Sequence, residues 1–190
     1  MTLPSFFIDD SNANNFEETI DFFMSWTIRC ADVIHQNRSK KVYASARNIL
    51  AKLLHFEYAD GLVFSNIKVW KQHKNMDLWI ELNVNDQPYA LIIENKMYSK
   101  ILPNQLNRDQ KIVEEHYKNE TARIIEYVLL RPDYELDKQD RPFVVVSDFH
   151  AINLVQLADS VADKKTGNDL FDEFWFNWAI DSEIKRGKKS

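Results

Sequence analysis

The stretch that most constrains the fold runs from Met76 to Lys96 and reads MDLWIELNVNDQPYALIIENK. Two largely apolar runs of strand length are separated by the cluster Asn-Asp-Gln-Pro at 85–88. Turn-forming residues between two such runs predict a β-hairpin with a tight turn. The apolar run at 90–93 then gives way abruptly to the polar residues at 94–96. We therefore expect this hairpin, with a charged end, to organise the chain.

Three charged side chains are expected to meet at that end of the hairpin. Because side chains alternate along a strand, Glu94 and Lys96 share a face and lie about 6.6 Å apart. Asp77 opens the first strand and can lie opposite them across the hairpin. Two carboxylates and an ammonium group can bind a divalent metal ion and position a water molecule for attack on a phosphodiester. The spacing makes such a site geometrically possible.

The order of these motifs resembles the PD-(D/E)XK nuclease superfamily, the fold of restriction endonucleases and of many recombination and repair nucleases. The likeness extends to a branch that carries Asp-Ile-x-Ile-Glu, then Ile-Glu-Asn-Lys, then Gln-Leu on the next helix. Here these segments read DLWIE at 77–81, IENK at 93–96 and QL at 105–106. Glu-x-Lys alone occurs by chance on many solvated surfaces, whereas the whole ordered series is more specific.

The resemblance implies an α/β, restriction-endonuclease-like fold: a mixed central sheet flanked by helices, with two N-terminal helices and a C-terminal aromatic helix. It implies that Asp77 and Glu94 hold Mg²⁺ or Mn²⁺ together with the backbone carbonyl of Asn95. Lys96 would orient or deprotonate the attacking water, and Gln105 would bind near the metal or the scissile phosphate. The implied activity is a metal-dependent nuclease, with DNA as the expected substrate ahead of RNA.

The sequence also offers candidates for a further acidic residue. Related proteins often carry one before the catalytic aspartate, and Glu57 and Glu18 are the candidates here, although either can be an ordinary solvated charge. The loop at 71–74, where relatives often show an acid, has none. Some related nucleases also carry a tyrosine four residues after the glutamine, where this chain has Asp109.

Charge is distributed unevenly along the chain. The formal net charge is −5, yet residues 38–74 hold eight basic and two acidic residues. A basic segment directly before Asp77 can form a phosphate-facing patch, and a solvated basic helix explains the same run equally well. The candidates for substrate contact are Lys71, His73, Lys74, Lys100, Arg108 and Lys111.

Hydrophobic spacing gives the coarse order of elements. The expected helices cover 15–36, 39–57, 103–118, 150–158 and 168–185, and the expected strands outside the hairpin cover 62–70, 123–130 and 143–146. A helix between strands implies a crossover, so the strand at 123–130 is expected to pair parallel to the strand that ends at Glu94. We expect one domain over 1–190, with a helical part at 14–57, a catalytic core at 62–147, helices at 148–185 and a basic tail at 186–190.

Composition limits the setting of the protein. No apolar run approaches the roughly 20 residues of a membrane span, no secretory leader is recognisable, and Cys30 has no partner. We therefore expect a cytoplasmic protein without membrane contact. Aromatic residues at 171, 174, 175 and 178 line one side of the last expected helix and are usually core, although they can also form a homodimer surface.

Two other functions are open from the sequence. The first is a non-catalytic module that retains the nuclease fold and binds protein or nucleic acid, which the acidic net charge and the missing upstream acid permit. The second is a helical adaptor, which leaves the central strands unexplained. The triad Asp77, Glu94 and Lys96 favours the nuclease over both, because binding alone needs no such triad.

Overall fold

A five-stranded mixed sheet forms the centre of the protein in the computed structural model, which describes residues 16–96, 101–131 and 147–179. The strand order is β1-β2-β3-β4-β5; β1, β2 and β3 are antiparallel neighbours, and β3, β4 and β5 are parallel. The strands are β1 (Phe64–His73), β2 (Met76–Val84), β3 (Gln87–Asn95), β4 (Ile124–Leu130) and β5 (Phe149–Ile152). The helical elements are α1 (Phe16–Cys30), η1 (Val33–His35), α2 (Lys40–Leu53), α3 (Gln105–Tyr117), α5 (Leu154–Asp159), α6 (Asp169–Asp172) and the π-helical segment η2 (Glu173–Trp178).

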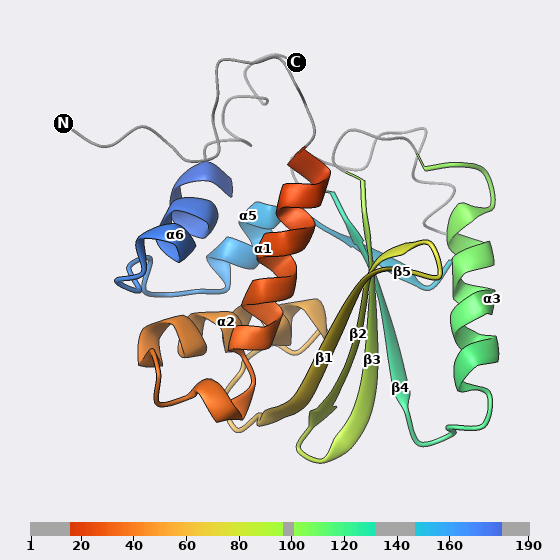
Figure 1. Cartoon of the computed structure of the whole chain (residues 1–190), viewed down its shortest axis with the longest axis horizontal. Helices are drawn as coiled ribbons and strands as arrows, with labels where there is room; N and C mark the ends of the chain where they lie inside the picture. Colours follow the sequence, from red (N-terminus) through yellow and green to blue (C-terminus); the bar gives the residue numbers. More distant parts are fainter. Residues whose placement is uncertain (1–15, 97–100, 132–146, 180–190) are drawn as a thin grey trace.

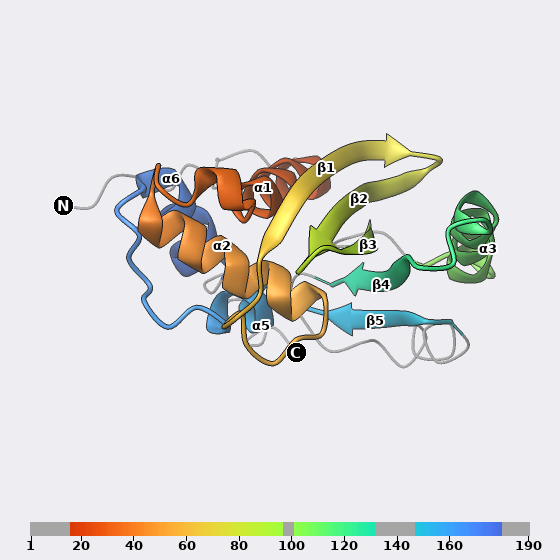
Figure 2. The ribbon, with the colours of Figure 1, turned by 90° about the horizontal axis from the view of Figure 1, so that it is seen from below.

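The helices cover the two faces of the sheet unequally. Helices α1, α2, α5 and α6 lie on one side, and α3 alone lies on the other (Figures 1 and 2). Because side chains alternate along the strands, each strand contributes residues to the cores on both faces of the sheet. Leu78 and Ile80 join the larger core, whereas Trp79 and Ile92 join the core beneath α3. The expected α/β architecture is confirmed. Among the described helices, none is long and apolar enough to cross a membrane.

The central hairpin forms as predicted, with a shorter turn. Asn85 and Asp86 make the turn with φ of 47° and 69°, a left-handed conformation that Asn and Asp tolerate and that suits a two-residue hairpin turn. Gln87 and Pro88 belong to β3. The Asn85 side chain also accepts a 2.8 Å hydrogen bond from the backbone N–H of Val63, just before β1. Three strands are therefore fixed in register by local chemistry.

The predicted crossover is also confirmed. Helix α3 leaves the end of β3 and returns the chain to β4, which pairs parallel to β3 with Ile93 opposite Val128. A buried chain of hydrogen bonds holds α3 on the sheet. Trp79 Nε1 donates to the hydroxyl of Tyr117 at 2.7 Å, and that hydroxyl donates to Glu81 at 2.8 Å. Glu81 is thus a structural anchor, consistent with its distance of about 13 Å along the strand from Asp77.

Three expected helices are shorter than predicted. The first ends at Cys30, because Asp32 caps the turn of η1 and also accepts a 2.9 Å hydrogen bond from Ile67 N. The second ends at Leu53, and His55 turns away with a left-handed φ of 60°. The third, expected from Pro103 to Lys118, begins at Gln105 after Asn104, whose φ is also 60°.

The C-terminal part of the structure differs most from the prediction. His150 was expected in a helix and lies in strand β5, since the helix begins only after Asn153, which forms a capping box with Gln156. The strand expected at 143–146 falls outside the described residues. The aromatic segment starts as α6 and continues as η2, with Phe171, Phe174 and Trp175 fully buried, so these side chains are core. Its expected extension to 185 lies beyond the described part of the chain.

Candidate active site

The candidate site lies where β2 begins and β3 ends. Leu78 pairs with Ile93 in the antiparallel ladder, so Asp77 stands opposite Glu94 one step further, and both side chains leave the sheet on the α3 side. Asp77 Oδ2 accepts a 2.7 Å hydrogen bond from the backbone N–H of Asn95, and Oδ1 accepts a 2.9 Å bond from Gln72. The position of the aspartate is therefore fixed by both neighbouring strands.

Glu94 is the most constrained acid of the site. Its side chain is only 3% exposed, and its Oε1 accepts hydrogen bonds from Lys96 Nζ at 2.7 Å and Gln105 Nε2 at 2.5 Å. Its Oε2 is buried and has no hydrogen-bond partner among the described residues. A buried acceptor without a donor is costly unless another group, such as a metal ion, satisfies it. One oxygen of Glu94 is thus held by the protein and the other is free to bind.

The protein groups around Glu94 disfavour its charged form. The pKa of Glu94 is raised to about 7, mainly by burial and next by the nearby carboxylate of Asp77, while the Lys96 ammonium acts in the opposite direction. A divalent cation between the two carboxylates would reverse this balance, because it stabilises both negative charges.

Asp21 on α1 is a third acid near the site, and the sequence interpretation missed it. Its side chain is 5% exposed, and its Oδ1 accepts a 2.9 Å hydrogen bond from the Asn95 side chain, whose amide also donates to Glu17 O at 3.1 Å. Burial is the main cause that raises the pKa of Asp21 to about 7; the Asn95 bond opposes it and the charge of Asp77 adds to it. Asn95 thus links the acid on α1 to the end of β3.

A sequence signal for Asp21 existed. Asp21 precedes Met24 and Ile28 by three and seven residues, which is the spacing of one helix face, and both of those residues are fully buried. An acidic residue within a buried stripe indicates a satisfied or functional group more often than a solvated one. The spacing therefore distinguishes Asp21 from its neighbour Glu18.

Neither of the two further acids predicted from the sequence, Glu18 and Glu57, lies at the candidate site. Glu18 is exposed on α1. Glu57 is exposed in the segment after α2, and the adjacent Phe56 packs against Tyr89, which lies five residues before Glu94 and hence about 17 Å away along β3. Glu57 therefore lies near the opposite end of that strand.

Gln105 and Asp109 occupy the first turns of α3 beside Glu94. The Gln105 side chain is buried and its Oε1 accepts a 3.3 Å bond from Leu102 N, which directs its amide N–H toward Glu94. Asp109 lies one turn later, is fully buried, and accepts two hydrogen bonds from the Arg108 guanidinium at 3.0 and 3.1 Å. Burial raises the pKa of Asp109, while Arg108 and Lys96 lower it. The residue that replaces the tyrosine of some relatives is thus a third buried acid at the site, beside Glu94 and Asp21.

The predicted substrate-contact residues fall into two groups. Lys71 projects to the α1 side, where its Nζ lies 2.8 Å from the centroid of the half-exposed Phe22 ring, and it lowers the pKa of Asp21. His73 packs edge-on against Trp79, with the ring centroids 5.0 Å apart, and Lys74 Nζ lies 2.8 Å from His116 Nδ1. Lys100 lies outside the described residues.

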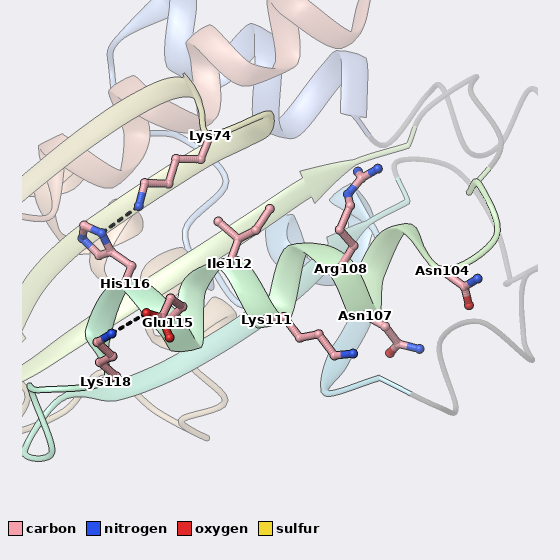
Figure 3. Close-up of a pocket in the computed structure, with 9 residues that line it drawn as sticks. All are labelled: Lys74, Asn104, Asn107, Arg108, Lys111, Ile112, Glu115, His116 and Lys118. Atoms are coloured by element: carbon pink, nitrogen blue, oxygen red, sulfur yellow. Dashed lines mark hydrogen bonds and ion pairs between the residues drawn. The ribbon is translucent and has the colours of Figure 1, made fainter.

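A basic groove of about 940 Å³ runs along the exposed side of α3, beneath the turn between β1 and β2 (Figure 3). Four cations line it, and one of them, Lys118, is paired with the acid of the groove, Glu115. Arg108 belongs both to the groove and, through Asp109, to the acidic site. The lining residues are Lys74, Asn104, Asn107, Arg108, Lys111, Ile112, Glu115, His116 and Lys118.

The donor set suits a hard divalent cation. Mg²⁺ and Mn²⁺ prefer carboxylate and carbonyl oxygens, and the site offers Asp77, the unpartnered Oε2 of Glu94 and the Asn95 carbonyl at the strand end. The residues therefore fit such an ion, which would polarise a phosphate and acidify a bound water.

Comparison with known proteins assigns the family. The model of the PD-(D/E)XK nuclease superfamily matches residues 11–168, which spans α1 through the segment before α6 and includes every acid described above. No curated protein and no solved structure matches the chain. The family match covers far more than half of the sequence, and the chain therefore belongs to the PD-(D/E)XK nuclease superfamily.

Proposed function

We propose that this protein is a metal-dependent nuclease that hydrolyses phosphodiester bonds of nucleic acid, with DNA as the substrate. The superfamily is typically catalytic and typically uses a divalent metal. The observation that carries the proposal is the asymmetric environment of Glu94. One carboxylate oxygen is fixed by Lys96 and Gln105, and the other, opposite Asp77, is buried without a hydrogen-bond partner in the part of the chain that the structure describes. A buried carboxylate oxygen without a hydrogen-bond partner calls for an explanation, and a metal ion bound between Glu94 and Asp77 would supply one.

Each residue has a defined task in this proposal. Asp77, Glu94 and the Asn95 carbonyl would hold Mg²⁺ or Mn²⁺. Lys96, whose ammonium group already contacts Glu94, would orient the attacking water and stabilise negative charge on the phosphate oxygens. Gln105 would keep the Glu94 carboxylate oriented, in the way that outer hydrogen bonds fix metal ligands.

The basic groove supports nucleic acid as the substrate. Phosphate contacts supply most of the affinity of proteins for nucleic acid, and cations and amides are the groups that make them. Lys74, Arg108 and Lys111 line the groove beside two asparagine side chains. Arg108 also contacts Asp109, so a phosphate backbone in the groove would pass close to the acidic site. DNA is the first choice because the restriction and repair enzymes that the motifs resemble act on it.

Cleavage by the purified chain tests the proposal. Plasmid DNA, single-stranded DNA and structured RNA would each be incubated with Mg²⁺ or Mn²⁺. Wild type should cut DNA, and Glu94→Gln and Lys96→Ala should lower the rate by at least about 100-fold. Glu57→Gln is the matched control, since it removes an exposed carboxylate far from the site, and it should cut at the wild-type rate.

Two results would contradict the proposed activity. One is the absence of cleavage on all three substrates by folded wild-type protein with either metal, which would favour a binding module that retains the fold. The other is cleavage that persists in Glu94→Gln, which would indicate a contaminating nuclease or a different site.

A further inference from the structure

A second cluster of metal-binding side chains lies on the opposite face of the sheet. Glu126 pairs with Leu91 in the β3–β4 ladder and His150 with Val128 in the β4–β5 ladder, and both apolar partners belong to the larger core. Glu126 and His150 therefore project toward the α2 side, whereas Glu94 projects toward α3. The cluster and the acidic site do not share residues or a face.

His55 completes this cluster from the end of α2. Its left-handed φ of 60° is uncommon for a residue with a side chain, and it turns the ring toward β4 and β5. The nitrogen and oxygen atoms that the three side chains offer all lie within 4.8 Å of one another. His55 Nε2 lies 3.9 Å from Glu126 Oε2, and the His55 and His150 ring centroids are 4.3 Å apart.

These contacts do not provide hydrogen bonds for the three side chains. A separation of 3.9 Å exceeds a hydrogen bond, and in the described part of the chain none of the three side chains makes one. Two imidazole rings and a carboxylate therefore bring three potential metal-ligand atoms close together without hydrogen bonds that occupy them. Ligand atoms around a tetrahedral Zn²⁺ ion lie about 3.4 Å apart, so a rotamer adjustment of about 1 Å would close the set.

The donor set selects the class of ion. Imidazole nitrogen suits Zn²⁺ and neighbouring transition metals, whereas Mg²⁺ prefers an all-oxygen site. A metal ion binds the neutral form of an imidazole, and burial, with His150 and Lys52 nearby, lowers the pKa of His55. The His55 side chain is 39% exposed and that of Glu126 is 24% exposed, which leaves room for a water as fourth ligand.

We propose that His55, Glu126 and His150 form a binding site for Zn²⁺ or a similar transition-metal ion, separate from the acidic site. The ion would connect the end of α2 to β4 and to β5, a strand of only four residues at the edge of the sheet. Its first effect would be to stabilise this edge. The inference rests on the cluster alone and holds whether or not the chain cleaves nucleic acid.

Zn²⁺ binding to the full-length, metal-stripped protein tests the site, measured by titration calorimetry at pH 7.5. All proteins would carry Glu94→Gln, which removes a ligand of the acidic site. The parent should bind one equivalent of Zn²⁺. His55→Gln or His150→Gln should weaken binding at least about tenfold, since even the loss of a hydrogen bond to a metal ligand has an effect of that size. His35→Gln removes a histidine outside the cluster and should bind like the parent.

Thermal unfolding separates a lost ligand from a lost fold. Because the cluster is partly exposed, the two histidine variants should unfold at the parent temperature without metal. Zn²⁺ should then raise the unfolding temperature of the parent and of His35→Gln, and raise that of His55→Gln and His150→Gln much less. Absence of Zn²⁺ binding in the parent, or binding that survives both cluster substitutions, would overturn the proposal.

Discussion

Gln105 Nε2 lies 2.5 Å from Glu94 Oε1, and this contact joins the first residue of α3 to the penultimate residue of β3. The amide can donate only to an acceptor, so it favours the ionised carboxylate and fixes its orientation. Gln105→Ala should therefore weaken Mn²⁺ binding and cleavage by about 10- to 100-fold, the usual effect of losing an outer hydrogen bond at a metal ligand.

Gln110→Ala is the matched control for that change. Gln110 also lies on α3, but its side chain bonds to Glu114 and Asp148 and not to Glu94. Mn²⁺ affinity by calorimetry and initial cleavage rates should both match wild type. Equal effects of the two alanine substitutions would show that the loss reflects α3 in general and not the Gln105–Glu94 contact.

Asp21→Asn should stabilise the metal-free protein at alkaline pH. The pKa of Asp21 rises from 3.8 to about 7 in the folded state, mainly through burial, so the folded chain retains a proton that the unfolded chain has released. The contribution of this group to stability therefore falls as pH rises from about 4 to about 7 and stays low above that. Asparagine can still accept the bond from Asn95 and carries no charge.

Urea unfolding with a chelator present measures this effect. Asp21→Asn should gain about 1–3 kcal/mol over wild type at pH 8 and much less at pH 5. The exposed neighbour provides the control, and Glu18→Gln should change stability little at either pH. A variant that is less stable than wild type at pH 8 would mean that the Asp21 charge stabilises the fold.

Loss of the hydroxyl should have opposite effects at two buried tyrosines, Tyr117 on α3 and Tyr127 on β4. Tyr117→Phe leaves Trp79 Nε1 and Glu81 without their shared partner and should lower the free energy of unfolding by about 1–3 kcal/mol. The hydroxyl of Tyr127 is buried and has no hydrogen-bond partner in the described residues, so Tyr127→Phe should be neutral or stabilising. Urea titrations of both variants give the comparison, and a larger loss for Tyr127→Phe would contradict it.

Removal of a groove cation should weaken substrate binding more than it slows chemistry. Lys111→Gln should raise KM for DNA several-fold with kcat nearly unchanged, and lower the slope of log affinity against log salt by about one. Lys41→Gln is the control, because Lys41 pairs with Asp163 away from the groove. A KM that depends equally on both lysines would indicate diffuse attraction to the protein surface.

Much of the fold could be predicted from the sequence because the patterns that determine it are local. The turn at Asn85 and Asp86 fixes the hairpin register, and that register alone sets Asp77 opposite Glu94. The crossover rule then predicted that β4 is parallel to β3. Strand β5 was missed because it has four residues and its two central side chains are exposed, so it shows neither an apolar run nor clear alternation.

Features that depend on packing between distant elements could not be predicted in the same way. Asp21 meets Asn95 across 74 residues of sequence, and only the docking of α1 against the end of β3 brings them together. The cluster of His55 with Glu126 and His150 depends on where α2 ends and on a strand that was predicted as helix. These contacts arise only when the distant elements pack together in three dimensions.

The central claim is that Asp77 and Glu94 bind the same divalent ion, and a crystal of wild-type protein grown with Mn²⁺ tests it most directly. Anomalous scattering should show a manganese peak within about 2.6 Å of both the Asp77 carboxylate and Glu94 Oε2. The same crystal form of Glu94→Gln should lose or greatly weaken that peak. A manganese ion bound to only one of the two carboxylates, or found only elsewhere in the protein, would contradict the account.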